Sequence, residues 1–237
     1  MEVLPTILAA LWAGALALPA GWAWLQLPML IIALALHSSL SHELLHGHPF
    51  RSDWASDGIG LVQPGLFIPY LRFKTLHLAH HRNADLTDPY DDPESNYLDP
   101  QVWARLPDFV KRVLIFNNTL FGRMLVGPAI GTAVFWRSEA ALIRGGDWKV
   151  AQGWALHVPG VVITLWVVGQ TSVPLWIYLL ACYGAMSVLR IRTFLEHQAH
   201  EKSAGRSVII EDRGVLAFLF LNINFHVVHH LHPQVAW

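Results

Sequence analysis

Apolar residues fill two long stretches of this chain, residues 3–41 and 150–189, which contain no Asp, Glu, Lys or Arg. A helix crosses a bilayer with about 20 apolar residues, so each stretch is long enough for two such helices. Turn-forming residues divide both stretches, at Leu18-Pro-Ala-Gly21 and at Gly169-Gln-Thr-Ser172. The pattern therefore predicts two helical hairpins, with membrane spans at residues 4–19, 22–45, 151–169 and 174–195.

Polar and apolar residues are mixed between the two hairpins. Residues 109–116 and 120–144 carry spaced Arg and Lys within apolar runs, a pattern typical of helices that lie on a membrane surface. Residues 85–100 form an acidic loop interrupted by prolines, and no segment shows the alternation expected of a strand. We therefore predict an all-α membrane protein that forms one domain over residues 1–237, with a helical cap made of residues 46–149 and 196–237.

The positions of the basic residues predict an orientation. All 16 Lys and Arg lie within residues 51–149 and 190–213, and both hairpin turns lack them. Because cytoplasmic segments are enriched in these residues, we expect the cap, the tail and the N-terminus in the cytoplasm. The leading Met-Glu-Val-Leu-Pro segment lacks the positive charge of a signal peptide, so we interpret the first apolar stretch as part of the membrane domain.

Composition narrows the class of protein further. Hydrophobic residues make up 54% of the chain and charged residues 14%, whereas about 25% of an ordinary soluble protein is charged. The net charge of −1 gives no reason to expect a nucleic acid as partner. Cys182 is the single cysteine, which excludes an internal disulfide and a cysteine-ligated zinc or iron–sulfur site. We interpret it as a buried thiol.

Histidine is the residue type that suggests chemistry. The chain has 14 histidines, and most fall into clusters whose spacings of three and four place them on one face of a helix. Neutral imidazole binds iron, zinc, copper or nickel, and a firm site needs several imidazoles held rigidly. The clusters all lie at or beyond the predicted cytoplasmic ends of the spans, so they can converge on one polyhistidine metal site. They are His42 and His46 with His48; His77, His80 and His81; His197 and His200; and His226, His229 and His230.

The third cluster offers two alternatives for a metal ligand, since His197 and His200 both follow the last predicted span. We favour His197 and keep His200 as the alternative. Nearby carboxylates can orient imidazoles by accepting their second N–H. The candidates are Glu196, Glu211, Asp212 and the acidic residues from Asp85 to Asp92, although a solvated acidic turn explains that last segment equally well.

Three further histidines, and His48, have two interpretations each. His37 and His157 lie inside apolar segments, where ionisable groups are often functional but where a neutral imidazole can also bond a neighbouring carbonyl. His48 and His232 flank the clusters. They are candidates either for contacts to the ligands or for ordinary surface positions.

The boxes His-x3-His, His-x2-His-His and His-x2-His-His, in that order, resemble those of the membrane fatty acid desaturase and hydroxylase superfamily. The resemblance runs from residue 22 to the end and includes the acidic stretch from His81 to Pro89 and the ending His229-His-Leu-His-Pro233. It implies a non-haem diiron centre that activates O2 to oxidise a lipid alkyl chain, with electrons from a ferredoxin, cytochrome b5 or reductase partner. The implied ligands are His42, His46, His77, His80, His81, His197, His226, His229 and His230.

Within this superfamily we expect fatty acyl desaturation first. Hydroxylation or carotenoid ketolation is the alternative, because the compact size and the His-Leu-His-Pro ending are similar to those of bacterial carotenoid ketolases. In stearoyl-CoA desaturases the helix that bears the extra histidine also supplies an Asn, and Thr193 stands at that position here; Asn222 or Asn224 could take its place. The family's chains run on beyond this last motif, which leaves open whether this chain continues after Trp237.

Two competing interpretations belong to other classes of protein. His42-Glu43-Leu-Leu-His46 is also a zinc-protease motif, in which Glu43 would be the general base. Such a site needs one further ligand, so it leaves the other boxes unexplained. A haem protein or transporter with axial histidines would place them within the spans, where only His37 and His157 lie.

Overall fold

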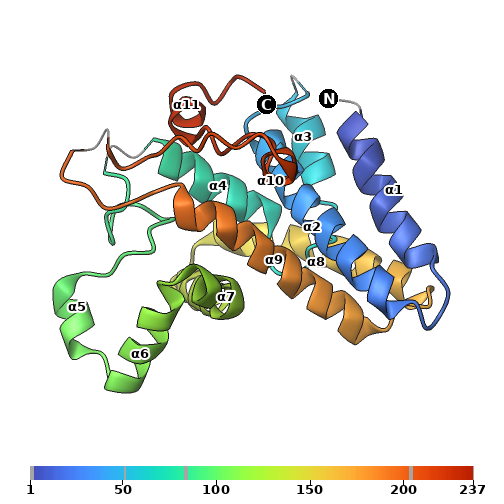
Figure 1. Ribbon diagram of the computed structural model, residues 1–237, viewed down its shortest axis with the longest axis horizontal. Helices are drawn as coiled ribbons and strands as arrows, with labels where there is room; N and C mark the ends of the chain where they lie inside the picture. The colour runs from blue at the N-terminus through green and yellow to red at the C-terminus, as the bar shows by residue number, and fades with distance from the viewer. Residues whose placement is uncertain (1–2, 51, 83–84, 203–204, 237) are drawn as a thin grey trace.

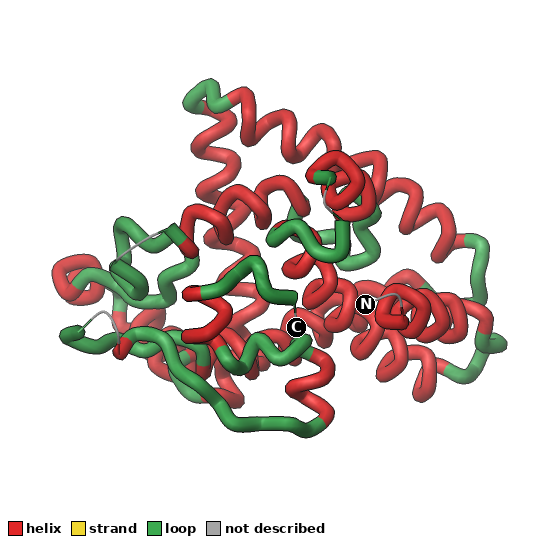
Figure 2. Tube along the Cα trace, turned by 90° about the horizontal axis from the view of Figure 1, so that it is seen from above, coloured by secondary structure: helices red, strands yellow, loops and turns green. Residues whose placement is uncertain are grey.

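In the computed structural model the described residues are 3–50, 52–82, 85–202 and 205–236, and they fold into helices joined by turns and loops (Figure 1). An isolated antiparallel bridge between His197 and Ser207 is the one piece of β structure in these ranges, and Figure 2 draws no strand in them. The all-α prediction is confirmed. The helices are α1 (Val3–Ala17), α2 (Ala23–Leu45), α3 (Asp53–Gly60), α4 (Tyr70–His81), α5 (Pro100–Arg105), α6 (Asp108–Asn117), α7 (Leu120–Arg144), α8 (Trp148–Gly169), α9 (Leu175–Leu195), α10 (Val215–Leu219) and α11 (His226–Leu231).

Three of these helices, α2, α8 and α9, are long and apolar enough to cross a membrane. They match the predicted spans at 22–45, 151–169 and 174–195. The helix in the place of the first span is shorter than predicted, because α1 ends at Ala17, just before Leu18 and Pro19, and a residue that precedes proline disfavours the helical conformation. Its 15 residues rise about 22 Å, less than the ~30 Å hydrocarbon core of a bilayer.

Helices α6 and α7 form a further apolar unit. Together they pass the same test of length and composition, but the pair is bent by 119° at its break. Thr119 lies at this break and caps α7, since its hydroxyl accepts a hydrogen bond from the Gly122 N–H at 3.0 Å. The described residues therefore contain three candidate spans, or four if the bent pair crosses. The layout of two hairpins with a cytoplasmic cap stays a prediction.

Helix α2 lies at the centre of the bundle and packs against α1 and α9 (Figure 1). In lipid, close packing and hydrogen bonds between helices replace the hydrophobic effect as the source of association. Gly184 of α9 allows such an approach, because a Cβ there would lie 2.7 Å from Ile31 of α2. The buried Tyr178 hydroxyl donates to the carbonyl of Pro64 at 2.8 Å and accepts from Trp12 Nε1 at 3.1 Å.

The turn between α1 and α2 lies beside the turn between α8 and α9. Gln26 Nε2 donates to the Leu18 carbonyl at 3.2 Å and to Ser172 Oγ at 3.3 Å, and Ser172 Oγ also donates to that carbonyl. Figure 1 shows this end of the bundle on the side away from α4 and α11. The histidine-bearing ends of the helices thus gather at the opposite end.

A buried ion pair fixes α4 against its neighbours. The Arg72 guanidinium of α4 donates to both carboxylate oxygens of Glu139 in α7, at 2.7 and 2.9 Å. Trp154 Nε1 of α8 donates to the same carboxylate at 3.0 Å. Arg72 is 6% exposed and Glu139 2%, so α4, which carries the second histidine box, is held by a charged contact with little access to water.

Candidate metal centre

The four histidine clusters meet at one end of the bundle, as the sequence predicts. Nine of their imidazoles form two groups in which the candidate ligand atoms lie within 4.8 Å of one another. Three boxes supply all but one of the nine, and His197, just after α9, supplies the last. Group A contains His42, His46, His77, His81 and His229, and group B contains His80, His197, His226 and His230.

Each three-histidine box is divided between the two groups. In α4, His77 and His81 belong to group A and His80 belongs to group B. In α11, His226 and His230 belong to group B and His229 belongs to group A. The sequence spacing suggested instead that each box aims in a single direction. The two groups adjoin, because the rings of His81 and His230, one from each group, stack with centroids 4.2 Å apart. Two neighbouring sites are thus built from shared helices.

The spacing of the imidazole nitrogens suits ligands of a shared metal ion. His80 Nε2 lies 3.0 Å from His197 Nε2, and His197 Nε2 lies 2.9 Å from His226 Nε2. Two metal–nitrogen bonds of about 2.1 Å at a right angle place their nitrogens about 3 Å apart. In group A, His46 Nε2 and His42 Nε2 are buried and have no hydrogen-bond partner among the described residues. A cation at the centre of each group would satisfy these nitrogens.

Carboxylates and a backbone carbonyl orient the rings from behind. His80 Nδ1 lies 2.7 Å from Asp92 Oδ1, and His77 Nδ1 lies 2.9 Å from Glu94 Oε1. His197 Nδ1 lies 3.1 Å from the Arg206 carbonyl. When Nδ1 donates its proton to such an acceptor, Nε2 keeps its lone pair toward the site. The lone pairs of His80 and His197 then face each other, an arrangement that a cation between them would stabilise.

The outcome for the predicted orienting carboxylates is mixed. Asp92 takes this role, and Glu196 Oε1 lies 3.5 Å from His226 Nδ1. Asp212 instead accepts from the N–H groups of Gly214 and Ala217 at the start of α10, and Glu211 is exposed. Sequence reasoning missed Glu94, which lies two residues beyond the segment named. Its position in the same acidic loop was the available signal.

Burial keeps most of these imidazoles neutral, as metal binding requires. It lowers the pKa of His197 to about 4 and that of His46 to about 3, helped by the neighbouring histidines. His80 differs: although burial opposes it, the hydrogen bond to Asp92 and nearby carboxylates raise its pKa. Despite the cost of burial, His80 and backbone N–H groups in turn lower the pKa of Asp92, which keeps this acceptor ionised.

The remaining histidines lie outside both groups. His200 Nδ1 contacts the Lys202 backbone, and it is His197 rather than His200 that lies beside the other candidate ligands. His37 Nε2 and His157 Nε2 bond backbone carbonyls, at 3.2 and 2.8 Å. His48 Nε2 lies 3.4 Å from the Pro233 carbonyl. His232 contributes to the wall of a cavity.

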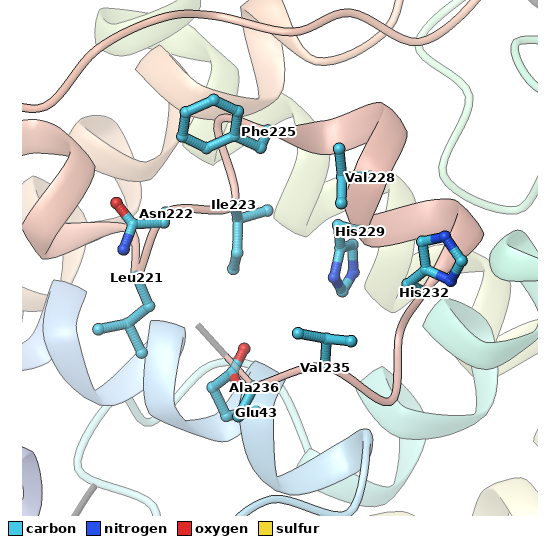
Figure 3. Close-up of a pocket in the computed structure, with 10 residues that line it drawn as sticks. All are labelled: Glu43, Leu221, Asn222, Ile223, Phe225, Val228, His229, His232, Val235 and Ala236. Atoms are coloured by element: carbon cyan, nitrogen blue, oxygen red, sulfur yellow. The ribbon is translucent and has the colours of Figure 1, made fainter.

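That cavity, of about 260 Å³, lies between the end of α2 and the C-terminal segment. Figure 3 shows its mostly apolar lining, with His229 of group A among the side chains around it. Leu221 and Asn222 form the turn beside it with φ of 52° and 53°, a left-handed conformation that non-glycine residues seldom adopt. The lining residues are Glu43, Leu221, Asn222, Ile223, Phe225, Val228, His229, His232, Val235 and Ala236.

Thr193 stands where stearoyl-CoA desaturases have an Asn, and the two candidates to replace that Asn, Asn222 and Asn224, have different surroundings. Asn224 Nδ2 donates to the carbonyls of Ile210 and Asp212 at 2.6 and 3.1 Å, which is a structural role. Asn222 lines the cavity. Thr193 Oγ1 is buried without a hydrogen-bond partner among the described residues.

The geometry bears on the two competing interpretations. A zinc protease binds one metal through three protein ligands, whereas His42 and His46 share group A with three histidines from α4 and α11. A haem would need its axial histidines within the spans. The two histidines that lie there, His37 and His157, bond backbone carbonyls instead. Both interpretations fit the site less well than a dinuclear centre does.

The chain belongs to the fatty acid desaturase family, whose sequence model matches residues 19–237. This family and the relatives described below indicate an oxidoreductase. With the apolar helices α2, α8 and α9, they also indicate a membrane protein. The histidine groups and the family together suggest iron as the metal.

Curated relatives include enzymes with two different reactions. The endoplasmic reticulum omega-3 fatty acid desaturase of Nicotiana tabacum is 18% identical, over 83% of this chain and 57% of its own. Beta-carotene ketolases from two strains of Paracoccus are 29% and 28% identical, each over 92% of this chain and 74% of its own. The chain thus spans little more than half the length of the tobacco enzyme. No solved structure matches it.

Proposed function

We propose that groups A and B bind two iron ions and that the protein uses O2 to oxidise an alkyl position of a membrane-dissolved lipid. One observation carries this proposal: two adjoining sets of histidine nitrogens, of five and four residues, share helices α4 and α11. Zinc has no redox chemistry and prefers four ligands, so it suits neither the reaction nor group A. Bound there, iron would supply the redox chemistry for O2 activation and C–H oxidation.

The residues of the chain contribute binding, orientation and exclusion of water. The nine histidines would hold the metals, while Asp92, Glu94 and the Arg206 carbonyl keep three of the rings turned toward them. His42, His80 and His226 are at most 3% exposed, so the centre is sheltered from water that would consume reactive species. The apolar cavity beside His229 is a suitable place for part of a lipid chain.

The oxidation needs an external source of electrons. In desaturation, two hydrogens leave adjacent carbons, and with two further electrons and two protons one O2 becomes two waters. Ketolation oxidises one methylene twice and consumes two O2 and four electrons before water is lost. We therefore infer a protein electron donor such as a ferredoxin, cytochrome b5 or reductase, which would dock on the cytoplasmic side if the predicted orientation is correct.

Fatty acyl desaturation is the first candidate reaction, because the family model is that of fatty acid desaturases. Carotenoid ketolation is the second, because the ketolases share more identity with the chain over more of both lengths. Expression in one host with defined fatty acids and in another that accumulates beta-carotene tests both. Mass spectrometry of the lipids then distinguishes loss of two hydrogens, gain of one oxygen, and replacement of two hydrogens by oxygen.

His80→Ala is the variant that links any product to the centre. We expect it to abolish turnover and to lower bound iron while leaving membrane insertion intact. His200→Ala is the matched control, since His200 lies outside both groups. Full activity and full iron content in His80→Ala would contradict the proposed centre, as would one zinc and no iron in the active wild-type protein.

A further inference from the structure

A second cavity lies on the side of α4 that faces α8. Its volume is about 560 Å³, and its walls are one side of α4 and the first turns of α8. Lys74 and Leu78 of α4 and Arg82, its C-terminal cap, line it at spacings of four, whereas His77 and His81 of α4 belong to group A. Because residues four apart share a face, the cavity and the metal groups use different faces of α4.

Basic side chains from both walls give this cavity a positive charge. Arg72 and Lys74 are neutralised within the fold, by Glu139 at 2.7 Å and by Asp57 at 2.7 Å. Arg82, which directly follows α4, and Lys149 of α8 form no ion pair with any described residue, and both are exposed. Two cations, one on each wall, are thus available to an anion.

The one carboxylate in the lining is already engaged. Asp147 Oδ1 accepts from the backbone N–H groups of Lys149 and Val150 at 3.0 and 3.2 Å and so caps α8. Gln152 and Thr75 add an amide and a hydroxyl to the walls, although the Thr75 hydroxyl donates to the Leu71 carbonyl at 2.8 Å. The lining as a whole keeps an excess of positive charge and offers further polar groups to a ligand.

The place of the cavity along α8 indicates which anion reaches it. α8 is a candidate membrane span, so its first turn lies at the level where a bilayer carries its phosphate groups. Trp148, the first residue of α8, is 75% exposed, and tryptophan favours this interface. A concave basic site at that level meets lipid phosphates at high local concentration.

We propose that the cavity between α4 and α8 binds the phosphate of an anionic lipid headgroup through Arg82 and Lys149. The bound headgroup bridges the helix that carries the second histidine box and a membrane span. This site is separate from the metal groups and does not depend on whether they hold iron.

Lipid binding by the purified full chain tests the proposal. Native mass spectrometry in detergent, with phosphatidylglycerol or phosphatidylcholine added, compares the wild type with Arg82→Gln/Lys149→Gln. Surface cations contribute about a fivefold preference each for anionic lipid, so we expect the double variant to bind phosphatidylglycerol about thirtyfold more weakly. Arg105→Gln/Arg112→Gln on α5 and α6 is the matched control. It removes two exposed cations outside the cavity.

The outcomes separate the possible ligands. If inorganic phosphate at millimolar concentration displaces the lipid, the phosphate group alone suffices for binding. If it does not, the lipid chains are also needed. Either result supports the site. Equal binding of the two lipids by the wild type, or an equal loss in the control variant, overturns the proposal. A double variant that keeps the lipid preference but accepts electrons more slowly from a reduced acidic donor protein overturns it too, and makes the cavity a protein-docking surface.

Discussion

Replacing Asp92 by asparagine tests how the acidic loop controls group B. Asp92 is 5% exposed, and its Oδ1 lies 2.7 Å from His80 Nδ1 and accepts from the Glu94 N–H at 2.9 Å. Its Oδ2 accepts from the Thr87 N–H at 2.9 Å. Asparagine has nearly the same shape but one oxygen, so its amide NH2 must face one of these donors. The variant therefore removes a hydrogen bond and the negative charge behind His80.

The size of the effect follows from these contacts. A buried donor left without a partner costs about 1–3 kcal/mol of folding free energy. Loss of the partner behind a metal-binding histidine lowers metal affinity about 10–100-fold. Because the Asp92 and His80 side chains are 2% and 1% exposed, water cannot replace the lost contact. We expect an effect near the upper end of that range.

Chelator titration of iron-loaded protein measures this difference. In Asp92→Asn we expect one of the two irons to leave at a roughly hundredfold lower chelator concentration than in the wild type. Glu94→Gln acts on His77 of group A and should have a smaller effect, since the Glu94 side chain is 33% exposed. Asp91→Asn, an exposed neighbour, is the control. Identical iron release from Asp92→Asn and Asp91→Asn would refute the reasoning.

Three further predictions concern the ligands, the packing of α4 and the metal itself. His197→Ala should lose the iron of group B, whereas His200→Ala should keep two irons per chain by elemental analysis; equal iron contents would refute the choice between them. Arg72→Met should lower stability by about 3–5 kcal/mol, because Glu139 is left buried without its partner. The double variant Arg72→Met/Glu139→Leu should recover most of this loss in thermal unfolding, and no recovery would count against the pair. Removal of iron by a chelator should lower the unfolding temperature, since a ligand present at about 100 times its Kd adds about 2.7 kcal/mol; an unchanged temperature would mean that the groups hold no metal tightly.

The sequence predicted the parts of the fold that depend on local pattern. Hydropathy located α2, α8 and α9, because the length of a span is set by the thickness of the bilayer. It overestimated the first helix, where the proline after Leu18 ends α1 early. It separated residues 109–116 from 120–144, as α6 and α7 are separated, but did not predict the 119° angle between them, since that angle depends on what both helices pack against.

The candidate ligands were predicted residue by residue, and the structure brings all nine into two groups. Spacing could not show that His80 and His81 serve different groups, because the side chains of adjacent helical residues point about 100° apart and the position of the neighbouring helices decides what each one meets. Glu94 was missed for a related reason. Its carboxylate reaches His77 through the path of a loop, and no period in the sequence describes such a path.

The sequence by itself thus determined the helical class, the apolar segments and the candidate metal-binding side chains, because these depend on composition and on spacing along one element. The tertiary structure alone decided how the histidines divide into five and four, which carboxylate stands behind which ring, and that Arg72 and Glu139 hold α4 in place. Those contacts join residues far apart in the chain. Their energies depend on distance and burial, which exist only once the helices have packed.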